Sequence, residues 1–188
     1  MKLRFLARWL AVAALFLSAA SAHAYDFMSG GIYYNVLSEE DRTVEVTSRD
    51  SYSRYSGSII IPERVLAGGK TYTVTSIGEY AFYNCDALTS VTFPATLTSI
   101  GDYAFYNCYV LTSVVFPVSL MFIGDYAFYG CSALTSVDLS STSLTSIGNY
   151  AFWECEALTS VAFPASLTSI GYYAFQGCDA LTNLTVDE

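Results

Sequence analysis

Few residues in this chain carry side chains suited to acid–base, nucleophilic or metal chemistry. The single histidine, His23, lies in an N-terminal segment that has the features of a cleaved secretion signal. Nucleophilic catalysis by serine or cysteine commonly uses an imidazole base, which the remaining chain lacks. Glu154 and Glu156 flank a cysteine, but their side chains diverge on a turn, and we interpret them as solvated charges. We therefore expect no enzymatic activity and no catalytic residue.

The cysteines all occupy one position of a repeated pattern. They are Cys85, Cys108, Cys131, Cys155 and Cys178. A disulfide framework normally has an even number of cysteines at irregular spacings, so no disulfide is expected. Their apolar surroundings predict buried thiols that pack as small hydrophobic groups. A straight column of thiols does not converge on the tetrahedral geometry that zinc requires, so we expect no zinc site.

Acidic residues also recur one repeat apart, at Glu79, Asp102 and Asp125. Such a ladder could hold calcium in principle. It lacks the glycine-rich phrase of calcium-binding β-rolls, however, so we expect neither a metal nor a cofactor.

A nine-residue motif, I-G-x-Y-A-F-x-x-C, positions all of these side chains. Its five copies begin at Ile77, Ile100, Ile123, Ile147 and Ile170, at intervals of 23 residues with one step of 24. A second phrase, L-T-S-V-x-F-P in its commonest form, lies between the copies. A fixed period in the twenties is typical of a solenoid, in which each coil buries its apolar face against its neighbours.

The second phrase has the alternation of a β-strand. In its first copy Val91 and Phe93 point to one side. Ser90 and Thr92 point to the other side, which predicts a strand with one buried face. Residues 97–100 predict a second, shorter extended piece in the same coil.

The motif itself suggests a different local structure. Ala81, Phe82 and Cys85 stand at positions i, i+1 and i+4, which predicts a brief helical turn. Coils stacked about 4.8 Å apart would align the phenylalanines of all copies in one buried column. That column consists of Phe82, Phe105, Phe128, Phe152 and Phe175.

Residues 1–24 predict a signal peptide. They combine a basic start, a short apolar stretch and an Ala-His-Ala cleavage site before Tyr25. No later apolar run reaches the length of a membrane span, so none is expected. The protein should therefore be exported, either secreted or placed at the cell surface, and a periplasmic location is also compatible.

Residues 25–70 lack the motif. Within them, residues 31–37 and 43–47 predict a hairpin, residues 48–58 a polar loop, and residues 59–62 a degenerate first coil. Because the end of a solenoid must shield its apolar coil, we interpret residues 25–70 as a β-rich N-terminal cap. Residues 71–188 then form the solenoid.

Basic residues are confined to the N-terminal part of the chain. Every Lys and Arg lies at or before Lys70, whereas ten acidic residues follow Tyr72. Without residues 1–24 the chain has five basic and seventeen acidic residues, a net charge of −12. Binding to nucleic acid or to an anionic membrane needs a basic surface, so neither is expected. The acidity is compatible with a basic protein partner, and equally with a role in solubility alone.

The repeats resemble those of the bacterial BspA-like leucine-rich repeat family, also called the treponemal type. The resemblance rests on L-x-x-V-x-F-P followed by L-x-x-I-G-x-Y-A-F-x-x-C and covers roughly residues 59–186. Residues 31–77 also resemble the cap of that family. The resemblance implies a curved solenoid of short parallel strands, export, and a role in adhesion or in binding host proteins.

The chain departs from the family pattern in two places. Leu139-Ser140 replaces the Phe-Pro ending where the 24-residue step falls, which predicts a local bulge. The last repeat runs to residues 186–188 without a visible C-terminal cap. This is compatible with end-to-end self-association or with a longer array.

Two surfaces remain as candidate ligand-binding sites. Opposite the Ala-Phe-Cys face, aromatic rows could stack on sugars, anchor a protein, or simply stack on each other from coil to coil. The rows are Tyr80, Tyr83, Tyr103, Tyr106, Tyr126, Tyr129, Tyr150, Trp153 and Tyr173. The outward face of the strands is smoother and mostly polar, and the resemblance implies that this face binds ligands. Its candidates are Ser90, Thr92, Ser113, Val115, Ser136, Asp138 and Ser160.

Three functions therefore stay open. The leading prediction is a secreted or surface-displayed module for protein–protein interaction, with adhesion to a host protein as its specific form. The second is a glycan-binding module that uses the aromatic rows. The third is a structural spacer or assembly unit.

Overall fold

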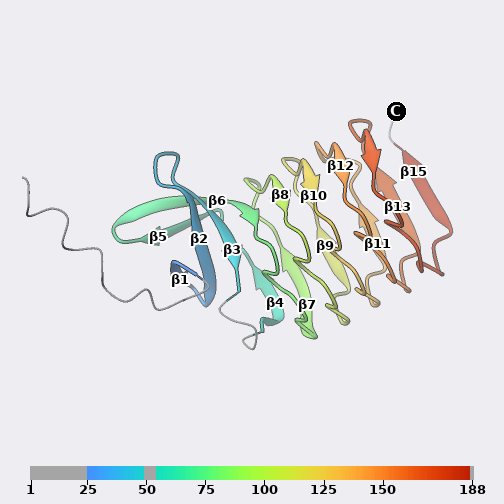
Figure 1. Ribbon diagram of the computed structural model, residues 1–188, viewed down its shortest axis with the longest axis horizontal. Helices are drawn as coiled ribbons and strands as arrows, with labels where there is room; N and C mark the ends of the chain where they lie inside the picture. The colour runs from blue at the N-terminus through green and yellow to red at the C-terminus, as the bar shows by residue number, and fades with distance from the viewer. Residues whose placement is uncertain (1–24, 49–53, 187–188) are drawn as a thin grey trace, which may run out of the picture.

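The computed structural model describes residues 25–48 and 54–186, which form a solenoid of stacked coils with a β-rich cap at one end (Figure 1). The predicted signal peptide lies outside these residues. Parallel strand ladders run along two sides of the stack, and turns join them. Among the described residues there are strands and turns but no helix.

One ladder begins in the cap and continues to the last coils. Its cap strands are β1 (Phe27–Ser29), β2 (Ile32–Ser38), β3 (Thr43–Thr47), β5 (Arg64–Ala67) and β6 (Lys70–Ile77). Its coil strands are β8 (Ser99–Ile100), β10 (Phe122–Ile123), β12 (Ser146–Ile147) and β14 (Ser169–Ile170). β2 and β3 form the predicted antiparallel hairpin, and β3 then pairs in parallel with β6. From β6 onward the motif isoleucine of one coil faces the isoleucine of the next, so this residue sets the register.

The other ladder is divided into two sheets, and its outward side is the strand face. The first sheet contains β4 (Ser56–Ile60), β7 (Ala87–Thr92) and β9 (Ser113–Val115). The second contains β11 (Ser136–Asp138), β13 (Ser160–Phe163) and β15 (Asn183–Val186). Ile59 of β4 pairs with Val91 of β7, so the degenerate first coil is a true member of the stack.

The division between β9 and β11 is close to the 24-residue step. The extra residue lies in the turn after β11, where Asp138 accepts hydrogen bonds from the amide and hydroxyl of Ser140. The hydroxyl of buried Thr142 donates to the carbonyl of Leu139 at 2.7 Å. The irregularity is therefore an interrupted ladder beside a reshaped turn, and not a bulge within a strand.

The predicted phenylalanine column forms the core. Its first four members are fully buried, and neighbouring rings lie 4.8 to 5.2 Å apart with nearly parallel planes. Tyr55 extends the column into the cap, with its ring 4.7 Å from that of Phe82. Its hydroxyl donates to the carbonyl of Thr47. The predicted polar loop is thus wrong at its C-terminal end, because Tyr55 packs on the core and β4 begins at Ser56.

The predicted helical turn is wrong. The amides of Tyr80, Phe82 and Asn84 donate to carbonyls of the next coil at 2.7 to 3.1 Å, and the amides between them close tight turns onto carbonyls three residues earlier. Tyr80 and Asn84 have φ values of 57° and 53°, which a right-handed helix excludes. An α-helix would satisfy its amides internally, whereas here every second amide links two coils. The segment is a stack of turns, which we call the turn face.

Candidate functional site

The aromatic rows of the turn face stack on themselves. In the outer row the rings of Tyr80, Tyr103, Tyr126, Tyr150 and Tyr173 follow one another at 4.7 to 5.5 Å. In the inner row the rings of Tyr83, Tyr106, Tyr129 and Trp153 follow at 4.6 to 6.1 Å. Every interior ring therefore has both of its faces covered by neighbours. What solvent meets is mostly ring edges and hydroxyl groups, not the flat surfaces on which sugars stack.

The tyrosines of the outer row adopt an unusual backbone. All five have φ between 55° and 57°, a left-handed conformation that costs a residue with a Cβ of order 1 kcal/mol or more. Each of the first four donates its amide hydrogen to a carbonyl in the next coil. Ring stacking and these hydrogen bonds offset the strain, so the rows contribute to cohesion between coils.

A small notch interrupts the turn face. It has a volume of about 340 Å³ and is lined by Tyr106, Tyr109, Tyr129, Glu154 and Glu156, among others. Burial, followed by the charge of Glu154, raises the pKa of Tyr129. Both glutamates are exposed, as expected for solvated charges.

The cysteines lie under the turn face, buried and without disulfides. The thiol of Cys131 donates to the carbonyl of Phe105 in the preceding coil at 3.2 Å, and Cys108, Cys155 and Cys178 make the equivalent bond. Burial raises the pKa of the Cys85 thiol to about 12. A reactive cysteine needs a lowered pKa and access to solvent. A hydrogen bond with Cys155 lowers the pKa of Cys178, but Cys178 is buried like the other four. The five thiols therefore pack the core, and four of them satisfy carbonyls of the preceding coil.

The strand face places its candidate residues side by side. Ser90 lies in register with Ser113, and Thr92 with Val115, on β7 and β9. Ser136 lies in register with Ser160 on β11 and β13. Asp138 is exposed at the end of β11, and the hydrogen bonds from Ser140 hold its pKa below the ordinary value. The division between β9 and β11 means that the candidates form two groups.

Sequence reasoning missed one group of exposed residues on the coil that contains β9 and β10. Val118, Met121 and Phe122 are exposed together with Val115. The available signal was a comparison of this coil with the other copies, which carry small or polar residues at the same positions.

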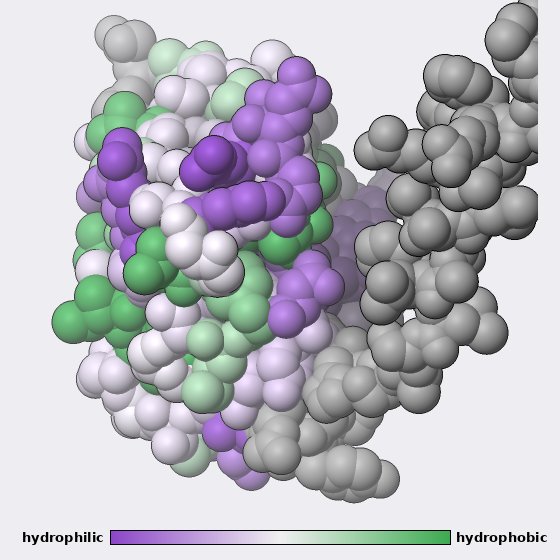
Figure 2. Space-filling model, turned by 90° about the vertical axis from the view of Figure 1, so that its left-hand side faces the viewer, coloured by the Kyte–Doolittle hydropathy of each residue, from purple (hydrophilic) through white to green (hydrophobic). Residues whose placement is uncertain are grey.

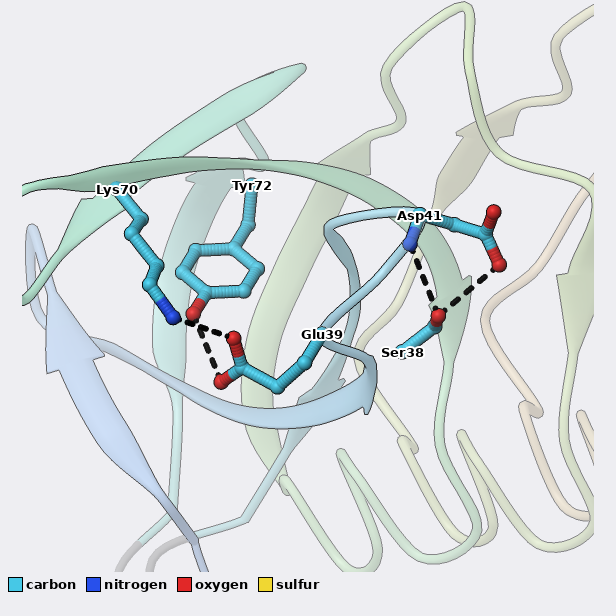
Figure 3. A network of polar contacts seen from close by, with 5 residues as sticks. All are labelled: Ser38, Glu39, Asp41, Lys70 and Tyr72. Carbon is cyan, nitrogen blue, oxygen red and sulfur yellow. Dashed lines mark hydrogen bonds and ion pairs between the residues drawn. The ribbon is translucent and has the colours of Figure 1, made fainter.

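The cap contains a further depression of about 700 Å³ between β1, β2 and the β5–β6 hairpin. Figure 2 views this end of the molecule, where hydrophilic and hydrophobic side chains lie intermixed. Lys70 donates to Glu39 at 2.8 Å, and the hydroxyl of Tyr72 donates to the same carboxylate at 3.0 Å (Figure 3). These two hydrogen bonds lower the pKa of Glu39. Lys70 is therefore paired with Glu39. The network ties the turn that follows β2 to strand β6.

Within residues 25–48 and 54–186, no helix is long and apolar enough to cross a membrane. No group of three or more histidine, cysteine, aspartate or glutamate side chains is arranged to hold a metal ion in that part of the chain.

The repeat sequence matches a known family. The model of the BspA type leucine rich repeat region matches residues 73–188, with six copies. The chain belongs to this family. Proteins with this repeat are generally non-enzymatic scaffolds, and membership indicates a protein-interaction module. No curated protein is detectably similar to the chain in sequence.

Solved structures of bacterial leucine-rich repeat proteins share the fold. A leucine-rich repeat protein of T. pallidum is 23% identical, with a TM-score of 0.70 over 86% of this chain and 85% of its own. One from Bacteroides ovatus is 27% identical, with a TM-score of 0.58, over 87% of this chain and 56% of its own. A leucine rich cell surface protein from Faecalibacterium prausnitzii is 26% identical, with a TM-score of 0.54, over 86% and 54%. The chain thus spans little more than half the length of the last two.

Proposed function

We propose that the chain is an exported protein-interaction module, secreted or displayed at the cell surface, which binds a protein partner through its strand face. Adhesion to a host protein is the specific form of this proposal. Export rests on the predicted signal peptide, and the similarity to a cell surface protein supports it.

The proposal rests on a contrast between the two faces: the aromatic rings of the turn face pack against each other, whereas most candidate side chains of the strand face are exposed to solvent. On the turn face the interior rings contact each other at 4.6 to 6.1 Å, which leaves little flat surface for a ligand. On the strand face the side chains are short, and most are exposed and held in register by the ladder. A rigid surface of this kind can match a protein over the area that specific association requires.

The test is to compare two variants of the purified protein against host extracellular matrix proteins and a glycan array. Ser113→Lys combined with Ser136→Lys alters the strand face without touching the core. Tyr106→Phe combined with Tyr129→Phe keeps the stacked rings and removes their hydroxyls. We expect a protein ligand whose binding is lost in the first variant and kept in the second. Binding to glycans alone, or loss confined to the tyrosine variant, would overturn the proposal.

A further inference from the structure

Two positions of the turn face hold an arginine side chain in the first copy of the motif. They are the residue before the motif cysteine and the residue after it, here Asn84 and Asp86. Nη1 of Arg54, which belongs to the cap, donates to the carbonyl of Asn84 at 2.7 Å. The same nitrogen lies 3.7 Å from a carboxylate oxygen of Asp86. The fold therefore contains one example of a guanidinium group bound at this pair of positions.

The residues at these two positions vary between copies. The later copies carry Asn107 and Tyr109, Gly130 and Ser132, Glu154 and Glu156, and Gly177 and Asp179. The fourth copy is the one that has a carboxylate at both positions, and we call Glu154 and Glu156 the glutamate pair. This pair carries one more negative charge than the pair that binds Arg54.

The glutamate pair has no cation of its own. Within the described part of the chain, no lysine or arginine forms an ion pair with either glutamate, and every basic residue of the sequence lies at or before Lys70. Both glutamate side chains are exposed. Two unneutralised carboxylates are therefore accessible at the positions that bind a guanidinium in the first copy.

The notch of the turn face provides room beside the glutamate pair. It lies where Gly130 and Ser132 of the third copy carry small side chains or none, between the glutamates of the fourth copy and Tyr109 of the second. Tyr109 belongs to neither aromatic row and has an exposed fraction of 48%, so its ring is accessible to a cation. Aromatic rings attract guanidinium groups through the charge distribution of their faces.

We propose that the glutamate pair and Tyr109 bind the guanidinium group of an arginine side chain on a partner protein. A guanidinium has five N–H donors in a planar fork that matches carboxylate oxygens, and it stacks on aromatic rings. A lysine ammonium is more strongly hydrated and has no planar face. A protein is the expected source of the arginine because the repeat family indicates a protein-interaction module. This contact lies on the turn face and goes beyond the proposed contact at the strand face.

Charge and the available ligand atoms disfavour other occupants. Two carboxylates repel an anionic group. No group of three or more histidine, cysteine, aspartate or glutamate side chains is arranged to hold a metal ion in the described ranges. Two copies of the chain, each with a net charge of −12, repel one another.

The test titrates three end-blocked tripeptides into the purified protein at low ionic strength, with NMR as the readout. Their central residues are arginine, lysine and citrulline, which has the shape of arginine without its charge. Because exposed ion pairs are weak, we expect the arginine peptide to bind with a dissociation constant of roughly 1 mM. The lysine peptide should bind about threefold more weakly or worse, and the citrulline peptide should not bind.

Four variants locate the site. Glu154→Gln and Glu156→Gln each remove one charge and keep the shape of the side chain. Ser132→Tyr fills the notch with the residue that the preceding copy has at the same position. Asp179→Asn removes one charge at the equivalent position of the last copy and is the matched control. Circular dichroism and a melting curve verify that each variant folds.

Each glutamate variant should weaken binding of the arginine peptide by about threefold or more. Ser132→Tyr should also weaken it, and Asp179→Asn should leave it unchanged. Absence of binding by the arginine peptide, or equal binding of the lysine or citrulline peptide, would overturn the inference. Unchanged binding in both glutamate variants, or an equal loss in the Asp179→Asn control, would overturn it too. The proposed strand-face function is tested with other variants and other ligands, so it stands or fails separately.

Discussion

The turn face and the strand face of each coil are built on opposite rules. On the turn face nearly the same residue types recur in every copy, and their amides, rings and thiols contact the neighbouring coils. On the strand face one position holds Thr92, Val115, Asp138, Ala162 and Thr185 in successive coils. The same junction is repeated between successive coils, so identity between copies reflects cohesion. Positions that vary between copies are not needed for cohesion, so their side chains are free to contact a partner.

The largest effect expected on the turn-face side of this comparison is a loss of stability in alkali. Burial raises the pKa of Cys85 from its ordinary value near 9 to about 12. The unfolded state therefore releases this proton first, so stability is intact below pH 9 and falls as the pH rises toward 12. At about 1.4 kcal/mol for each pH unit, the loss reaches the order of 4 kcal/mol.

Urea unfolding at a series of pH values measures this loss. The variant Cys85→Ala should show a shallower decline, because the titrating group is gone. A thiolate absorbance that appears near pH 9 in the native protein and is missing from the Cys85→Ala variant would contradict the prediction.

Glycine substitutions test how closely the coils approach. A Cβ on Gly148 would lie 2.5 Å from the backbone nitrogen of Asp125 and from the carbonyl carbon of Gly124. A Cβ on Gly78 would meet only the side-chain end of Glu45, at 2.8 Å, which can move. Gly148→Ala should cost about 1–3 kcal/mol of unfolding free energy, as overpacking does, and Gly78→Ala clearly less. Equal costs would show that the coils are not in backbone contact there.

A double-mutant cycle tests whether the tyrosine rows provide cohesion. The rings of Tyr106 and Tyr129 are 4.6 Å apart and nearly parallel. Their substitution to Ala, singly and together, should reveal a coupling of about 0.5–1.5 kcal/mol in urea unfolding. Tyr83 and Trp153 are three coils apart and share no ring partner, so they serve as the control, with coupling near zero. Similar coupling in both pairs would remove the basis for assigning cohesion to stacking.

The smallest effect is expected in the cap. Glu39 has a lowered pKa because Lys70 and Tyr72 donate hydrogen bonds to it. Its contribution is present above its ordinary pKa and is lost as the pH falls through the lowered value. Glu39 is solvent-accessible, and exposed ion pairs contribute little. Glu39→Gln should leave the melting temperature nearly unchanged at pH 7, and a large drop would assign the cap a greater role.

Much of this architecture could be predicted from the sequence, because the 23-residue period of the motif determines how the coils align. The spacing of Ile77 and its four counterparts predicts the register, and the matching spacing of Phe82 predicts the buried column. The helical turn was wrong because spacing alone does not distinguish a helix from successive tight turns. The missed signal was Asn84 and Asn107, since asparagine favours the left-handed conformation that ends a helix.

The strand face was only partly predictable. Alternation identifies Thr92 and Val115 as outward residues, but not which outward residues form a patch. On the other ladder, Phe122 precedes the buried Ile123 in the two-residue strand β10. The 23-residue period aligns Phe122 with Ser99, and the register with Ser99 and Ser146 confirms that it replaces a surface serine. The period does not give the exposure of an isolated apolar side chain, which depends on how the strands pair and pack.

The most direct test compares two phenylalanines six positions apart. Phe128 is fully buried between rings at 5.0 and 5.1 Å, and Phe122 is exposed on β10. Phe128→Ala should reduce the unfolding free energy by about 3–5 kcal/mol, whereas Phe122→Ala should change it by less than about 1 kcal/mol. If Phe122→Ala instead destabilised the fold as much as Phe128→Ala, the division between a cohesive interior and exposed side chains that the fold does not require would be contradicted.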